Sequence, residues 1–217
     1  MKQIASFIIM LCLLSCQSAE KQTTGTTENT VLVIITDNSL SYASRCPKIT
    51  GQILKQVCDK IIQTSNIDIR VGLVTADSNI EFARFTQSKS VSQSNPNPWI
   101  ESGREKPTTE PQNDWQIFSN ALAENAKQKP SKGSDIGGAL SHALLIFQEY
   151  PAKCRKILVI ATDYENNGMS IPPIDSTIEV ISIGKLPNIP IEKTLQTQNI
   201  KRVESLATAL QFISSTY

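Results

Sequence analysis

The sequence has little of what catalysis and nucleic-acid binding commonly require. It contains a single histidine, His142, no P-loop and no Gly-x-Gly-x-x-Gly motif after an apolar run. Its 21 basic and 20 acidic residues leave a formal net charge of +1, without a basic block. A near-neutral chain of this kind offers no electrostatic attraction for nucleic acid. We therefore expect neither an enzyme nor a nucleic-acid-binding protein.

After residue 15 the sequence also lacks an apolar run long enough to span a bilayer. Before that point Lys2 precedes the short apolar segment "IASFIIMLCLLS", which is typical of a secretory signal. The segment ends in "LLSC", which resembles the bacterial lipobox, and this resemblance implies that residues 1–15 are removed and that Cys16 carries lipid. A plain signal peptide is the alternative. Gln17, in place of aspartate, favours the outer membrane, so we expect a lipid-anchored protein of the bacterial cell envelope.

The composition divides the mature chain into a tether and a domain. Residues 16–30 are polar and lack periodicity, which is typical of a flexible tether with a reach of roughly 20 Å. Residues 31–217 are long enough for one domain with a substantial core. Within them, residues 86–114 are dominated by Ser, Gln, Asn, Pro and Thr, and we expect an exposed insertion there.

Continuous apolar runs alternate with amphipathic stretches from residue 31 onwards. Runs such as "VLVII" at 31–35 and "ILVIA" at 157–161 are typical of strands buried on both faces, as in parallel sheets. The short "DSN" at 77–79 predicts a hairpin. We expect an α/β fold, a doubly wound, mostly parallel six-stranded sheet in the order 3-2-1-4-5-6, with one antiparallel edge strand and helices on both faces. The expected strands are 31–36, 67–76, 80–85, 156–162, 177–184 and 200–205, and the expected helices are 47–62, 114–129, 136–150 and 206–213.

Three polar clusters fall where ligands bind in such folds, at the carboxyl ends of the strands or at the start of a helix. They are "DNSLS" at 37–41, "GSDIGG" at 133–138 and "DYENN" at 163–167. Because the first and fourth strands are expected to be neighbours, Asp37 and Asp163 should emerge side by side. Residues two apart in an extended loop point the same way, so Asp37, Ser39 and Ser41 can converge. Carboxylate and hydroxyl oxygens of this kind suit Mg²⁺, with an exchangeable position for a partner's carboxylate.

The order of these motifs resembles that of a von Willebrand factor A (vWA) domain with a metal-ion-dependent adhesion site, whose first element is Asp-x-Ser-x-Ser. Asp37, Ser39 and Ser41 match that element, and Asp163 matches the family's last aspartate. Ser134 stands where the family usually has threonine, and Tyr164 where it commonly has glycine. The resemblance implies a site for Mg²⁺, or for Mn²⁺ or Ca²⁺, and a protein partner whose Asp or Glu completes the coordination of the ion.

Other interpretations of the same residues remain open. "DNSLS" is also typical of a helix cap or turn, and the fold could carry a site without metal. Asp135 is expected to act as a charge at a helix N-terminus rather than as a ligand, and His142 as a surface residue. The alternative functions are a metal-independent envelope scaffold that uses the insertion, and a Mg²⁺-dependent hydrolase.

The predicted domain has an odd number of cysteines, Cys46, Cys58 and Cys154. Cys46 and Cys58 lie at either end of one predicted helix, about 18 Å apart, which excludes a disulfide between them. Cys58 and Cys154 are both expected at the edge of the sheet opposite the polar clusters, so any disulfide would join Cys58 to Cys154. Three buried free thiols are the alternative.

Overall fold

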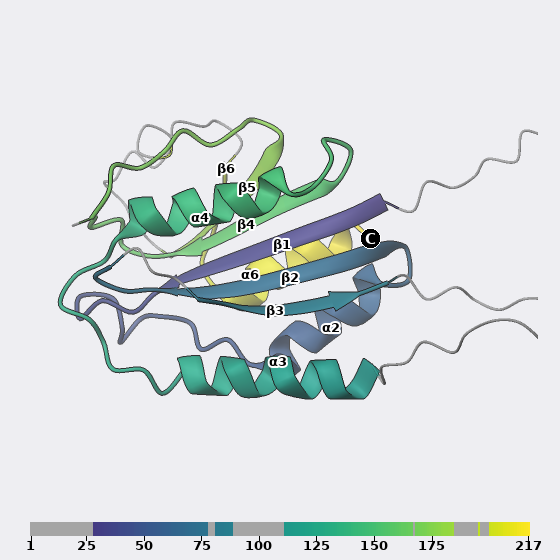
Figure 1. Ribbon diagram of the computed structural model, residues 1–217, viewed down its shortest axis with the longest axis horizontal. Coiled ribbons are helices and arrows are strands. Elements are labelled where there is room, and N and C mark those ends of the chain that lie inside the picture. Colours follow the sequence, from purple (N-terminus) through teal and green to yellow (C-terminus); the bar gives the residue numbers. More distant parts are fainter. Residues whose placement is uncertain (1–27, 78–80, 89–110, 167, 185–194, 196–199) are drawn as a thin grey trace, which may run out of the picture.

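The computed structural model describes residues 28–77, 81–88, 111–166, 168–184, 195 and 200–217. Its centre is a six-stranded sheet in the order β3-β2-β1-β4-β5-β6 (Figure 1), which confirms the predicted order. The antiparallel pair is β2 with β3, and the other neighbours are parallel. The strands are β1 Glu28–Asp37, β2 Ser65–Val74, β3 Phe82–Gln87, β4 Arg155–Ala161, β5 Ile178–Ile183 and β6 Ile200–Val203.

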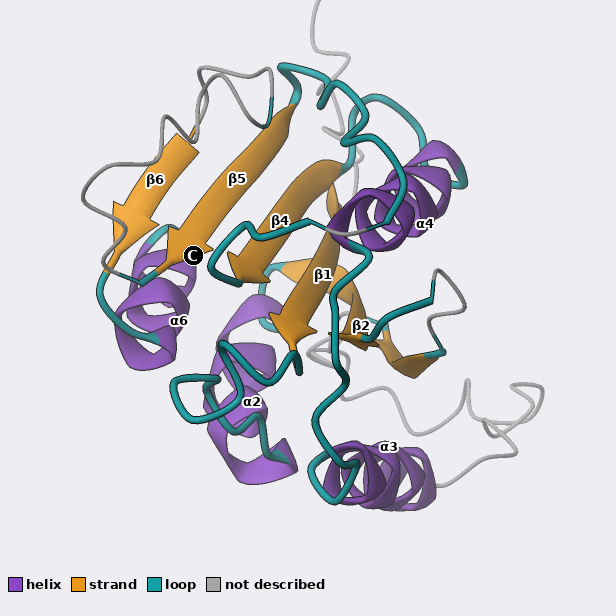
Figure 2. Ribbon diagram, turned by 90° about the vertical axis from the view of Figure 1, so that its left-hand side faces the viewer, coloured by secondary structure: helices purple, strands orange, loops and turns teal. Residues whose placement is uncertain are grey.

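Helices cover both faces of the sheet, as predicted (Figure 2). α4 lies on one face, and α2, α3 and α6 lie on the other. Side chains of β1 alternate between the two cores: Val31 and Val33 pack with α4, whereas Leu32 and Ile34 pack with the other helices. This double burial is why the strand is apolar at every position. The helices are α2 Gly51–Ile61, α3 Pro111–Asn125, α4 Ile136–Gln148 and α6 Leu206–Ser215.

Several element boundaries differ from those predicted. β1 begins at Glu28, so residues 28–30 belong to the sheet rather than to the tether. α2 begins at Gly51 rather than near Pro47, because the Thr50 side chain accepts a hydrogen bond from the Ile53 amide and caps the helix there.

The predicted insertion 86–114 is shorter at both ends, because β3 continues to Gln87 and α3 starts at Pro111. Its remaining residues, 89–110, lie outside the described part of the chain, as do residues 1–27 with the predicted lipidation site Cys16. In the described ranges, no helix has both the length and the apolar character needed to cross a membrane.

The cysteines of the domain are free thiols, and the Cys58–Cys154 disulfide is not formed. Cys58 is part of the core between the sheet and α2. Burial raises the pKa of the Cys58 thiol to about 12, and burial also raises that of Cys46 to about 11. Both thiols are therefore kept protonated and unreactive, since the thiolate is the reactive form.

We expect Cys58 to resist thiol reagents in the native protein at mildly alkaline pH and to react once the chain unfolds. Because its folded pKa of about 12 exceeds the ordinary value of about 9, the stabilisation from the protonated thiol is complete below pH 9 and is lost as the pH rises towards 12. Site-resolved mass spectrometry after alkylation, with and without urea, measures this. Rapid modification of native Cys58 would show that the thiol is not buried.

Candidate metal centre

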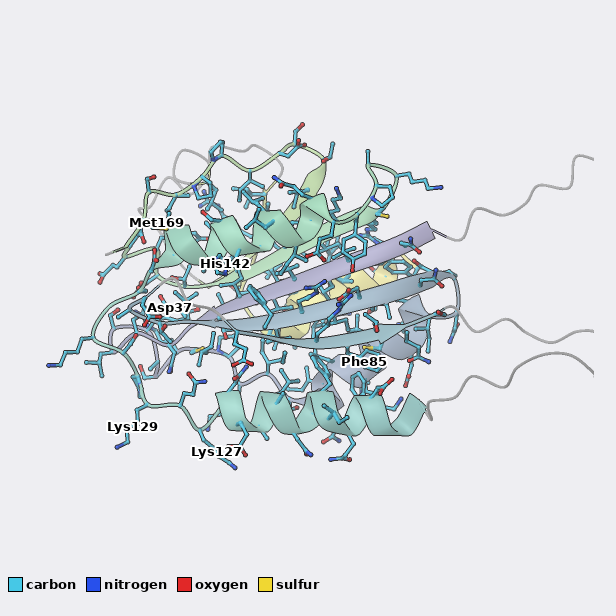
Figure 3. The ribbon with its side chains drawn as sticks, in the orientation of Figure 1. Asp37, Phe85, Lys127, Lys129, His142 and Met169 are labelled. Carbon is cyan, nitrogen blue, oxygen red and sulfur yellow. The ribbon has the colours of Figure 1, made fainter. Side chains whose placement is uncertain are left out.

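The candidate site lies where β1 and β4 end side by side. The two strands are parallel neighbours, with Thr36 opposite Ala161. The next residues on each strand, Asp37 and then Thr162 and Asp163, therefore reach the same edge of the sheet, which we call the carboxyl edge. Figure 2 looks onto this edge, and Figure 3 labels Asp37 there. Asp37 and Asp163 therefore emerge from neighbouring strand ends, as predicted, because β1 and β4 pair.

Hydroxyl groups connect the two loops directly. The Oγ atoms of Ser39 and Ser41 lie 3.1 Å apart, within hydrogen-bonding distance. Ser41 Oγ in turn donates to Asp163 Oδ2 at 2.9 Å, across 122 residues of sequence. The Ser39 and Ser41 hydroxyls therefore converge, as the Asp-x-Ser-x-Ser spacing predicts, and they lie beside a carboxylate from a second strand end.

Asp37 is held rigidly at the base of the cluster. Its side chain is fully buried, and each carboxylate oxygen accepts a hydrogen bond. The Ser39 amide donates to Oδ1 at 2.8 Å, and the Thr162 hydroxyl donates to Oδ2 at 2.7 Å. Two such hydrogen bonds fix the orientation of the carboxylate. Asp37 is thus a pre-positioned carboxylate next to the two serines.

Ser134 reaches the same loop by a different route. It is buried, and its hydroxyl donates to the Glu165 carbonyl at 2.7 Å, while the Glu165 amide donates to Asp163 Oδ1 at 3.1 Å. Ser134 therefore lies beside the Asp163 loop, but within the described part of the chain its side chain makes no hydrogen bond to the other four predicted ligands. A second backbone contact brings its segment to the first loop, because Leu40 and Asn38 pair with Ser131 on either side of Ser39.

The start of α4 is packed tightly against the loop that follows Asp163. Asp135 caps the helix by accepting from the Gly138 amide at 2.9 Å, and it also accepts from the Met169 amide at 2.7 Å. This confirms its predicted role at the helix N-terminus. A Cβ atom on Gly137 would collide with the Met169 carbonyl, so this approach requires glycine. The packing fixes the Asp163 loop relative to Ser134.

Three contributing residues were not predicted from the sequence. Thr162, the last residue of an apparently ordinary apolar strand, supports Asp37. Asn166 accepts from the Ile136 amide at 3.0 Å and so joins the Asp163 loop to α4. Arg45 forms an ion pair with Asp163, with Nη2 3.7 Å from Oδ2. Asn166 belongs to the polar cluster "DYENN", which could have pointed to it. The segment that contains Arg45 has no pattern that would predict where the Arg45 side chain lies.

The donor set fits a hard divalent cation. It combines two carboxylates with three hydroxyls, which are oxygen ligands of the kind that Mg²⁺, Mn²⁺ and Ca²⁺ prefer. The described ranges hold no cluster of three or more His, Cys, Asp or Glu. Asp37 and Asp163 are buried, but Ser41 is exposed, so the cluster opens to solvent on one side. Burial raises the pKa of the neighbouring Tyr42 phenol to about 12, which keeps it protonated and neutral beside the cluster.

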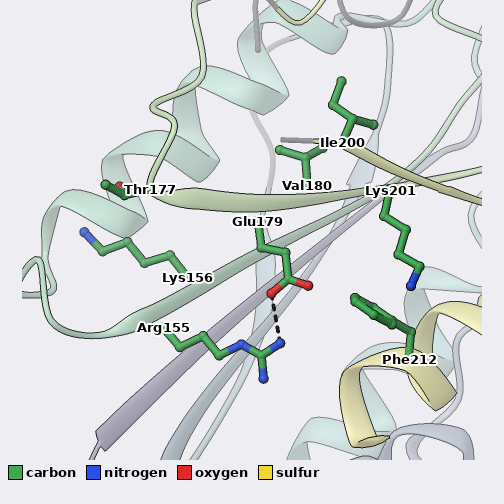
Figure 4. Close-up of a pocket in the computed structure, with 8 residues that line it drawn as sticks. All are labelled: Arg155, Lys156, Thr177, Glu179, Val180, Ile200, Lys201 and Phe212. Atoms are coloured by element: carbon green, nitrogen blue, oxygen red, sulfur yellow. Dashed lines mark hydrogen bonds and ion pairs between the residues drawn. The ribbon is translucent and has the colours of Figure 1, made fainter. Parts of the chain in front are cut away.

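Two other features do not form a comparable site. His142 is partly exposed on α4, and Figure 3 shows it further along the helix than the carboxyl edge. A hollow of about 490 Å³ lies by the starts of β4, β5 and β6 (Figure 4), with Lys156, Lys201 and Phe212 among its lining residues. There Arg155 is already paired with Glu179 at 2.8 Å.

No family model matches the sequence, and no curated protein matches it. Solved structures that resemble it include a von Willebrand factor type A protein from Catenulispora acidiphila, with 13% identity, a TM-score of 0.48, and coverage of 88% of this chain and 42% of that one. A second is PTMP1 of the mussel byssus with a zinc-occupied MIDAS motif, with 13% identity, a TM-score of 0.47, and coverage of 87% and 47%. A third is manganese-loaded TRAP of Plasmodium vivax, with 12% identity, a TM-score of 0.44, and coverage of 86% and 72%. The chain spans less than half the length of the first two.

Proposed function

We propose that the domain is a vWA-like module that binds a divalent ion at the carboxyl edge and, through it, a protein partner. Asp37, Ser39, Ser41, Ser134 and Asp163 would hold the ion, directly or through water. A bound Mg²⁺, Mn²⁺ or Ca²⁺ supplies a positive centre with an exchangeable position that an Asp or Glu of the partner can fill. The predicted lipid on Cys16 would keep the module at a membrane of the bacterial cell envelope, and the module itself would not be an enzyme.

The observation that carries this proposal is the chain of contacts from Ser39 through Ser41 to Asp163. A helix cap or a turn would be satisfied by donors close in sequence. Here the serine of the first loop donates to a carboxylate 122 residues away, at 2.9 Å. This contact brings the Ser39 and Ser41 hydroxyls to the Asp163 carboxylate, and the Ser39 amide ties Asp37 to the same loop, which supports a shared site more than a local cap does.

The remaining residues prepare this volume for an ion. Thr162 and the Ser39 amide orient the Asp37 carboxylate, and the Glu165 amide orients that of Asp163. Leu40 and Met169 are among the exposed large apolar residues, at 63% and 53% exposure. Leu40 belongs to the first loop, and Met169 follows the Asp163 loop. We propose that both take part in partner contact, because exposed apolar groups beside a charged centre are suited to an interface.

Two measurements with the ion and with envelopes test this function. A rise in melting temperature on adding Mg²⁺, Mn²⁺ or Ca²⁺, reversed by chelator, is expected because an ion that binds the native state stabilises it. Cross-linking in intact envelopes should recover a partner with the ion present and lose it with chelator. A partner recovered equally well with chelator would instead support the metal-independent scaffold. No thermal response to any of the ions would contradict ion binding.

A further inference from the structure

We propose that Arg45 is an internal cation of this site that competes with the divalent ion and so sets the affinity for it. This inference rests on the proposed function and concerns a residue that lies outside the Asp-x-Ser-x-Ser element and the other predicted ligands. Arg45 follows Ser41 by four residues, in the irregular segment between β1 and α2.

The guanidinium of Arg45 contacts the site at two points. Nη2 lies 3.7 Å from Asp163 Oδ2, the same oxygen that accepts from the Ser41 hydroxyl. Nη2 also donates to the Ser41 carbonyl at 3.0 Å. The guanidinium lies 5.3 Å from the centre of the Tyr42 ring, an arrangement that favours a cation. One cationic group therefore contacts the Asp163 carboxylate and the backbone of a second predicted ligand.

The charges at the site explain why this contact opposes ion binding. Asp37 and Asp163 bring two negative charges, of which Arg45 balances one. A divalent ion beside Asp163 would be repelled by the guanidinium and would compete with it for the same oxygen. The Arg45 side chain is 58% exposed, so solvent screens this repulsion and the effect is moderate rather than prohibitive.

A cavity next to Arg45 offers its side chain a second position, away from Asp163. A pocket of about 480 Å³ opens beside it, with a lining that includes Tyr42, Thr162, Gly184 and Glu204. Arg45 itself lines this pocket, and the proposal has its guanidinium turn from Asp163 into the pocket when an ion binds. In this proposal the Asp163 carboxylate pairs either with the Arg45 guanidinium or with the ion, but not with both at once.

Mn²⁺ titration of the full chain, followed by the electron paramagnetic resonance signal of free Mn²⁺, tests this proposal. Arg45→Gln should tighten Mn²⁺ binding about three- to tenfold, a change of the size expected for a partly screened charge. Arg45→Lys keeps the charge and should stay within about twofold of wild type. Lys48→Gln removes a nearby exposed charge that forms no ion pair with Asp163, and it controls for general electrostatics.

The outcomes separate this proposal from the function on which it rests. If wild type and Arg45→Gln bind Mn²⁺ equally well, the site exists and Arg45 does not regulate it. If Arg45→Lys behaves like Arg45→Gln, the hydrogen-bond geometry and not the charge is responsible, and competition between cations is wrong. If no variant binds Mn²⁺, the proposed function itself fails. A weaker affinity in Arg45→Gln would make Arg45 a supporting residue and overturn the proposal.

Discussion

Replacing Asp37 with asparagine is expected to abolish the ion-dependent rise in melting temperature. Asparagine has nearly the same shape, and its carbonyl can still accept from the Ser39 amide, so the ion-free fold should change little. The variant loses one of the two carboxylate charges that attract the ion. At an ion concentration about 100 times the dissociation constant, wild type should gain about 2.7 kcal/mol of stability, and the variant close to none.

The matched control for this prediction is Asp59→Asn. Asp59 is an exposed carboxylate on α2 that pairs with Lys55 at 2.9 Å, in the same helix. The substitution removes the same charge outside the predicted ligand set, so the thermal response to the ion should remain. Differential scanning fluorimetry of both variants, with and without Mg²⁺, measures the difference. A full ion response in Asp37→Asn would contradict a role for Asp37 in holding the ion.

Tyr164→Ala is expected to cost about 3–5 kcal/mol of stability, the usual range for truncating a large buried aromatic side chain. Tyr164 is buried in the core beneath α4, and its hydroxyl bonds to Ser182 Oγ at 2.9 Å. Its backbone is unusual, because Tyr164 is the one non-glycine residue with positive φ in the described ranges, at 62°. Any L-residue is strained there by about 1–2 kcal/mol, whereas glycine is not.

The positive φ of Tyr164 also predicts the relative stabilities of other substitutions at this position. Tyr164→Gly loses the ring but relieves the strain, so it should be more stable than Tyr164→Ala by about 1 kcal/mol, the reverse of the usual order. Tyr164→Phe keeps the ring and should lose only about 1 kcal/mol, from the hydrogen bond to Ser182. Urea unfolding of the three variants measures these differences. A glycine variant less stable than the alanine variant would show that φ is not strained.

Tyr164 stands where glycine is common in the family that the motifs resemble, and the structure shows how tyrosine is accommodated there. In the family that the motifs resemble, glycine is common directly after the last aspartate, and the reason for glycine is usually a positive φ. The structure keeps that backbone conformation with tyrosine, whose ring fills the core and whose hydroxyl is bonded. The substitution therefore alters the balance between strain and packing, and it leaves Asp163 in contact with Ser41.

The strand order could be predicted because the strands that carry it are buried on both faces. Runs such as "VLVII" have no polar face and therefore belong in the interior of a parallel sheet, with helices above and below. The alternation of strands and helices, with one hairpin, then leaves few topologies. The meeting of Asp37 with Asp163 followed from this order, because each comes at the end of one of two neighbouring strands.

What could not be predicted depends on contacts between distant segments. In the sequence, Thr162 is one more residue at the end of an apolar strand. Its hydroxyl reaches Asp37 only because β1 and β4 pair in the sheet. The ion pair of Arg45 depends on the path of the loop from Ser41 to α2, which has no periodicity to indicate it. Pro47 suits a first helical turn and so predicts a start of α2 that is too early, whereas the Thr50 side chain provides the cap.

The most direct test of the account is to locate a bound ion by nuclear magnetic resonance with Mn²⁺. Paramagnetic broadening is strongest for nuclei close to the ion. We expect one Mn²⁺ per chain to broaden the backbone amide signals of residues 37–41, 134 and 163–165 first, and we expect excess Mg²⁺ to reverse the broadening. Broadening centred elsewhere, or no specific broadening, would contradict the claim that the carboxyl edge of this sheet holds a divalent ion.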